Sequence, residues 1–120
     1  MILLILIGGF FGACLRYVIN GWLSKYNQSF PLSTLVINLI GSSLIGLSAG
    51  IGIKQGSGIH MFTVIGALGA FTTFSTFAIE ALELLLSKKH RTFWIYSCFS
   101  LVGSFLCCLV CYLLMKNMGY

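Results

Sequence analysis

Residues 59–86 read IHMFTVIGALGAFTTFSTFAIEALELLL, and this stretch decides the fold. It is apolar for longer than the roughly 20 residues that a membrane-spanning helix needs. Its middle, however, holds Gly66, Gly69 and a cluster of four hydroxyl residues at 72–76. Glycines and hydroxyls at mid-depth are typical of transporter helices whose unwound backbone lines a cavity. We therefore expect a third span with a break near residues 69–74.

Three more apolar segments accompany this one, and we expect them to form helices at about 2–24, 32–53 and 93–115. Of the 120 residues, 58% are hydrophobic and only 8% are charged, far from the composition of a soluble domain. The chain is predicted to be an all-α membrane protein, with residues 1–120 forming a single transmembrane domain. We expect it in the cell (plasma) membrane, surrounded by lipid and crossing it several times.

The loops between the expected helices are too short to hold a site, so function must lie within the membrane. No nucleophile with a base, metal-ligand cluster or phosphate loop is found in the sequence, so we predict that the chain is not an enzyme. Its seven basic residues are scattered, and no nucleic-acid partner is expected.

Basic residues outside the spans give a weak orientation signal. With Arg16 set aside as intramembrane, one side carries Lys25, Lys88, Lys89 and Arg91, and the other carries Lys54 and Lys116. A chain with so small a bias can insert both ways, and two opposite copies can pair as an antiparallel homodimer.

Polar side chains within the spans are costly in hydrocarbon, so each requires an explanation. Arg16 either snorkels or pairs helices, or it attracts anions or has a structural role near a vestibule. Asn38 is either interhelical glue or a donor facing a polar space. Thr34 lies one turn before Asn38 on the same face. Both interpretations stay open for each residue.

Other polar and aromatic residues recur at helical spacing. Tyr96, Ser100 and Ser104 share one face of the fourth helix, as a donor track or as interhelical hydrogen bonds. Glu80 follows Thr76 by one turn and is expected to cap the hydroxyl patch. If the backbone stays helical, a single ridge is expected to carry three aromatic residues: Phe71, Phe74 and Phe77.

Three motifs carry a resemblance that covers essentially the whole chain. They are GGFFGACLR at residues 8–16, TLVINLIGS at 34–42 and GALGAFTTFSTF at 66–77. The chain resembles the CrcB/Fluc fluoride channels, although the fourth helix has no comparably sharp motif. The resemblance implies a fluoride-selective passive channel that lowers cytoplasmic fluoride and so confers fluoride resistance.

The resemblance also implies an antiparallel dual-topology homodimer with two fluoride pores and a structural sodium ion at the dimer interface. Gly69 and Thr72 would offer backbone carbonyls to sodium. Arg16 and Glu80 would be vestibule or structural charges. The fluoride pore would be lined by Asn38, Phe74, Phe77, Ser75, Thr76, Tyr96, Ser100 and Thr34.

Two other classes of function remain as alternatives. A small dual-topology proton-coupled multidrug exporter has the same size and helix number, but it typically needs a carboxylate in the first helix, where this chain has Arg16 and no acid. A purely structural membrane subunit would leave the hydroxyl cluster at mid-span unexplained.

Overall fold

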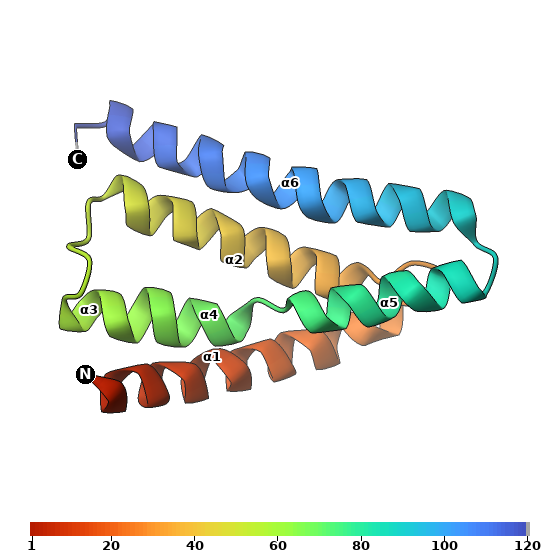
Figure 1. Cartoon of the computed structure of the whole chain (residues 1–120), viewed down its shortest axis with the longest axis horizontal. Helices are drawn as coiled ribbons and strands as arrows, with labels where there is room; N and C mark the ends of the chain where they lie inside the picture. Colours follow the sequence, from red (N-terminus) through yellow and green to blue (C-terminus); the bar gives the residue numbers. More distant parts are fainter. Residues whose placement is uncertain (120) are drawn as a thin grey trace.

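The computed structural model describes residues 1–119 as a set of helices packed side by side (Figure 1). The first span is α1 (Ile2–Leu23), which a short 3₁₀ turn, η1 (Ser24–Tyr26), continues; the second is α2 (Leu32–Gly50), and the fourth is α6 (His90–Asn117). The third span consists of four consecutive segments, α3 (Gly58–His60), the π-helix η2 (Met61–Leu68), α4 (Gly69–Phe71) and α5 (Phe74–Leu86). The start of α1 and the end of α6 lie at the same end of the molecule, as four crossings require.

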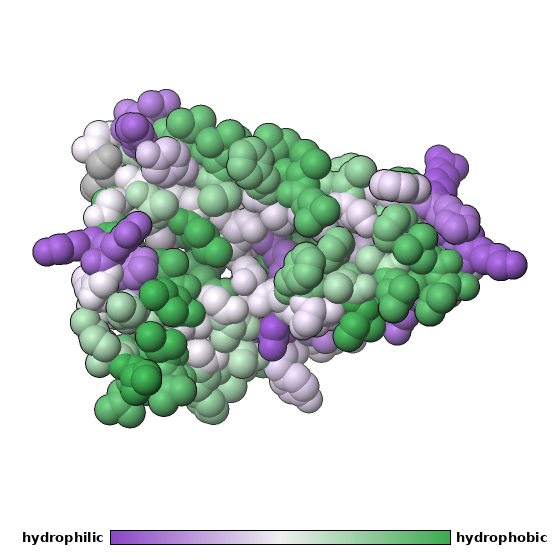
Figure 2. All heavy atoms as spheres, in the orientation of Figure 1, coloured by the Kyte–Doolittle hydropathy of each residue, from purple (hydrophilic) through white to green (hydrophobic). Residues whose placement is uncertain are grey.

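The prediction of four membrane-spanning helices is confirmed. The segments Ile2–Tyr26, Leu32–Gly50, Gly58–Leu86 and His90–Asn117 are all long and apolar enough to cross a bilayer. The long axis of the molecule measures 46 Å, which matches a bilayer about 40–45 Å thick with its headgroups. Figure 2 shows apolar residues over the middle of the molecule and hydrophilic ones gathered mainly at its two ends.

Two helix ends differ from those expected. The second helix ends at Gly50 rather than near residue 53, because the chain turns through Gly52, whose φ of 75° is left-handed. Glycine adopts this conformation without strain, and helices commonly end just before such a residue. The fourth helix begins at His90 rather than near residue 93. Basic side chains are well placed in that first turn because they reach the headgroup level.

Small residues let the spans approach closely. A Cβ atom on Gly12 would overlap the carbonyl oxygen of Ala67 in η2, and one on Gly46 would overlap the carbonyl oxygen of Cys108 in α6. These backbones touch because no side chain intervenes at either glycine, and the helices can therefore pack closely.

Two extended residues lie between α4 and α5. Thr72 has ψ of 153°, and Thr73 has φ of −145° and ψ of 118°. The Oγ1 of Thr73 accepts a hydrogen bond from the Thr76 amide at 3.3 Å and so caps α5. The aromatic ridge expected for a continuous helix therefore does not form, because the backbone is not helical here: Phe71 is 2% exposed and Phe74 is 72% exposed.

Candidate functional site

The side chain of Asn38 pairs with the backbone at the interruption of the third span. Its Oδ1 accepts from the Thr73 amide at 2.8 Å, and its Nδ2 donates to the Thr73 carbonyl at 2.9 Å. The N–H and C=O groups of Thr73, an extended residue at membrane depth, are thereby both hydrogen-bonded. In hydrocarbon these groups would otherwise stay unpaired, which costs considerable free energy. An amide nitrogen carries two hydrogens, so Asn38 keeps one N–H for another acceptor.

A cavity of about 250 Å³ lies beside this pair, and we call it the phenylalanine cavity. It is lined by Asn38, Ser42, Ile45, Thr72, Thr73, Phe74, Phe77, Ser100, Leu101 and Ser104. The Phe74 and Phe77 ring centroids are 5.6 Å apart with the ring planes at 45°. The Oγ of Ser100 is buried, and it has no hydrogen-bond partner among residues 1–119. A buried hydroxyl without a partner next to a cavity is available to donate to an occupant.

A second cavity, of about 340 Å³, lies on the α1 side of the interruption, and we call it the arginine cavity. Its polar lining comes from Arg16, Tyr17, Asn20, Thr34, Thr73 and Thr76. Thr73 lines both cavities. Arg16 therefore shares a cavity with two residues of the hydroxyl cluster, Thr73 and Thr76.

Glu80 connects three helices through its carboxylate. Its Oε1 accepts from the Thr34 hydroxyl of α2 at 2.9 Å, and its Oε2 accepts from the Tyr96 hydroxyl of α6 at 2.7 Å. Thr34 is 2% exposed and Tyr96 is fully buried. The pairing satisfies a carboxylate within a span, which would otherwise be very costly. Glu80 thus does not cap the hydroxyl patch as expected, because two hydroxyls from other helices reach it.

The Tyr96 ring lies between two phenylalanines. Its centroid is 5.3 Å from that of Phe77 and 5.5 Å from that of Phe30. Because Phe77 also lines the phenylalanine cavity, the Glu80 carboxylate is connected to that cavity through the packed rings of Tyr96 and Phe77.

The remaining residues of the predicted site lie at the surface of the single chain. Ser75 and Thr76 are exposed, as is Gly69, while Thr72 is half-buried. The Thr73 hydroxyl donates to Thr76 Oγ1 at 3.0 Å. The Thr73 amide, which would otherwise bond to the Gly69 carbonyl within a helix, donates instead to Asn38.

Sequence reasoning placed most of these residues in one region but missed the central position of Thr73. The structure gathers Asn38, Phe74, Phe77 and Ser100 around one cavity, and Thr34, Glu80 and Tyr96 in one hydrogen-bonded group. Thr73 directly precedes α5, and a threonine before a helical stretch is a recognisable N-cap signal. Its pairing with Asn38, 35 positions away, has no local signature.

Comparison with known proteins agrees with this architecture. Residues 3–112 match the family model described as CrcB-like protein, Camphor Resistance (CrcB). The chain belongs to this family. It is a multi-pass integral protein of the cell membrane.

Several relatives share extensive sequence with it. A protein of Geobacillus kaustophilus (strain HTA426) named fluoride-specific ion channel FluC 1 is 50% identical over 50 residues, which cover 42% of this chain and 43% of that protein. A FluC 2 of Bacillus thuringiensis subsp. konkukian (strain 97-27) is 45% identical over 95 residues, 78% of this chain and 79% of the relative. A FluC 4 of Brucella abortus biovar 1 (strain 9-941) is 34% identical over 115 residues, covering 90% and 83%.

The matched part of the chain thus spans less than half of the first of these relatives and most of the other two. The relatives are named as ion channels, so the prediction that this CrcB-like chain is not an enzyme is confirmed.

Replacing Asn38 by leucine should destabilise the interruption of the third span. The change removes two hydrogen bonds and leaves the Thr73 N–H and C=O unpaired, at about 1–3 kcal/mol for each buried group. Thermal unfolding in detergent should occur at a lower temperature, and hydrogen exchange at residues 72–76 should accelerate. Ser42→Ala, in the same cavity lining, is the control and should change neither. Unchanged exchange in Asn38→Leu would show that the amide does not hold the interruption.

Proposed function

We propose that this chain is a fluoride-selective passive channel through which fluoride leaves the cell, so that cytoplasmic fluoride falls. Membership of the CrcB-like family and relatives named as fluoride-specific ion channels support the proposal. The observation that carries it is the phenylalanine cavity. There a buried hydroxyl without a partner, a spare amide N–H and aromatic rings meet beside an interrupted membrane helix.

The lining of this cavity suits a small anion. Fluoride holds its water tightly, so a pathway must replace that water with compact donors. Ser100 and Asn38 can donate an O–H and an N–H, and the edges of the Phe74 and Phe77 rings carry the positive part of the aromatic quadrupole. No lysine or arginine lines the cavity, so an ion that enters is not held by a full positive charge and can leave, as conduction requires.

We also propose that the third span acts as a broken helix at the centre of an antiparallel homodimer. Ser75, Thr76 and the largely exposed Phe74 ring lie on the surface of one chain near mid-span. Exposed hydroxyls at this depth would be poorly satisfied by lipid, so a partner surface is needed to cover them. Arg16 lines the arginine cavity together with Thr73 and Thr76. The weak charge bias of the loops permits opposite orientations of two chains.

The interruption also fits a structural sodium ion at the dimer interface. The last carbonyls of a helix lack partners within it, and the Thr73 amide that would serve Gly69 is taken by Asn38. Thr72 is extended, so its carbonyl no longer points along the helix axis. Backbone carbonyls at unwound segments are suitable ligands for a sodium ion. Gly69 and Thr72 would hold it, and it would balance the carbonyl dipoles where two chains meet.

The position of the carboxylates does not support the alternative of a proton-coupled multidrug exporter. Both acids of the chain, Glu80 and Glu83, lie on α5, and Glu80 already accepts two hydroxyls. The relatives are named as ion channels.

Fluoride flux in a Phe74→Ile variant tests the proposed pore. Phe74 is 72% exposed, so the change should cost one chain little stability. An isoleucine has no comparable quadrupole, and fluoride efflux from liposomes should fall about tenfold, which corresponds to losing about 1.4 kcal/mol of ion stabilisation. The control is Phe105→Ile, at a ring 66% exposed on α6, which should retain wild-type flux. Equal flux in the two variants, normalised per folded protein, would remove the rings from the pathway.

A Gly69→Val variant tests whether the interruption faces a partner. A Cβ atom on Gly69 would meet only the Val64 carbonyl oxygen, at 3.8 Å, so one chain has room for a side chain there. We expect dimerisation and sodium-dependent stability to be lost in Gly69→Val. The control Gly21→Val should retain both, because a Cβ atom on Gly21 would meet no atom within 4 Å outside its own helix turn. Size-exclusion chromatography in detergent, with and without sodium, gives the result. A sodium-responsive dimer in Gly69→Val would contradict this placement of the interface.

A further inference from the structure

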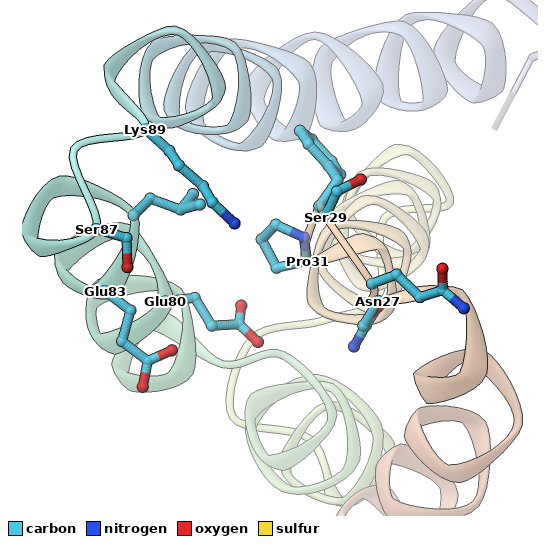
Figure 3. A pocket seen from close by; sticks show the side chains of 10 residues that line it. Asn27, Ser29, Pro31, Glu80, Glu83, Ser87 and Lys89 are labelled. Carbon is cyan, nitrogen blue, oxygen red and sulfur yellow. The ribbon is translucent and has the colours of Figure 1, made fainter.

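We propose that Lys89 eases the entry of anions into the pathway by offsetting carboxylate charge, and that Glu83 opposes it, at a third cavity which we call the carboxylate cavity. This inference rests on the proposed channel function. The cavity has a volume of about 230 Å³ and lies between residues 27–31, the C-terminal half of α5 and the start of α6. Figure 3 shows Lys89 extending into it from the start of α6 and Glu80 pointing into it from α5.

The carboxylate cavity adjoins the site already described. Glu80 forms part of its lining, and the same carboxylate accepts the hydroxyls of Thr34 and Tyr96. Beyond Tyr96 lies the Phe77 ring, which lines the phenylalanine cavity. The two cavities therefore take their α5 lining from successive parts of that helix, Phe74 and Phe77 for one and Glu80, Glu83 and Leu84 for the other.

One wall of the carboxylate cavity is held in place by hydrogen bonds. The Asn27 amide nitrogen donates to the Ser33 hydroxyl at 2.7 Å, and the Ser33 backbone amide donates to Asn27 Oδ1 at 2.9 Å. These bonds fix the connection between α1 and α2 against the start of α2. The wall of the cavity opposite α5 accordingly has a defined shape.

The charge of this cavity is unfavourable for an anion, and Lys89 reduces that charge by half. The chain has only two acids, and both Glu80 and Glu83 line the cavity. Lys89 is the one cationic side chain in that lining. With both carboxylates ionised, the lining carries one net negative charge with Lys89 and two without it. Clefts of one sign repel ions of the same sign and lower their local concentration.

The neighbouring basic residues do not replace Lys89. Lys88, Lys89, His90 and Arg91 are all exposed, and of these four only Lys89 lines the cavity. Salt screens exposed charges over about 10 Å at 0.1 M ionic strength, so the charge nearest to an ion in the opening acts on it most strongly. Glu83 is exposed, one turn from Glu80, and its charge acts against that of Lys89.

The test measures initial fluoride efflux from liposomes at several ionic strengths, set with sodium gluconate on both sides and normalised per folded protein. At low ionic strength Lys89→Gln should lower efflux about three- to fivefold, and the loss should shrink toward wild type at high ionic strength. Glu83→Gln should raise efflux about twofold under the same low-salt conditions. The double variant should lie near wild type, and Lys89→Arg should retain wild-type efflux.

Lys88→Gln is the matched control, since it removes the same charge one residue away and outside the cavity lining. If wild-type protein conducts fluoride and Lys89→Gln behaves like Lys88→Gln at every ionic strength, the inference is overturned while the channel function stands. A loss in Lys89→Gln that does not depend on salt also contradicts it, because a structural defect is not screened. If wild-type protein carries no fluoride, the proposed function falls and the inference falls with it.

Discussion

The pairing of Asn38 with both backbone groups of Thr73 is the interaction on which the rest of the site depends. Hydrocarbon offers no water to an unwound backbone, so a membrane helix can be interrupted only where another group takes over its hydrogen bonds. Here one amide side chain from α2 does so, with bonds of 2.8 and 2.9 Å. The interruption turns Phe74 outward while Phe71 stays buried, and it leaves room for cavities on both sides of Thr73.

The charged and aromatic groups are arranged around that interruption. Glu80 binds Thr34 and Tyr96 and so links α2, α5 and α6 at the level just beyond the phenylalanine cavity. Its negative charge is satisfied by hydroxyls, and no lysine or arginine lines the phenylalanine cavity. Positive side chains instead lie at two other places, Arg16 in the arginine cavity and Lys89 in the carboxylate cavity. The phenylalanine cavity thus lacks a full positive charge that could trap an anion.

Hydropathy and composition were sufficient to predict the four spans, because lipid imposes a length and an apolar character on each helix. The hydroxyl cluster at residues 72–76 and the intramembrane Asn38 also marked the region where the third span is interrupted, because polar groups in hydrocarbon are costly. The partners of these groups were not predictable. Tyr96 and Thr34 meet Glu80 only after α2, α5 and α6 have packed, and no local spacing records that. The aromatic ridge failed because helical periodicity does not continue across two extended residues.

The most direct test of the central claim is the reversal potential of purified protein in a planar bilayer, with a tenfold fluoride gradient and equal chloride and pH on the two sides. A passive fluoride pathway should give a reversal potential near the fluoride equilibrium potential, about 59 mV for one charge at 25 °C. That potential should not move when a pH gradient is added. A reversal potential near zero, or one that follows the pH gradient, would contradict the account.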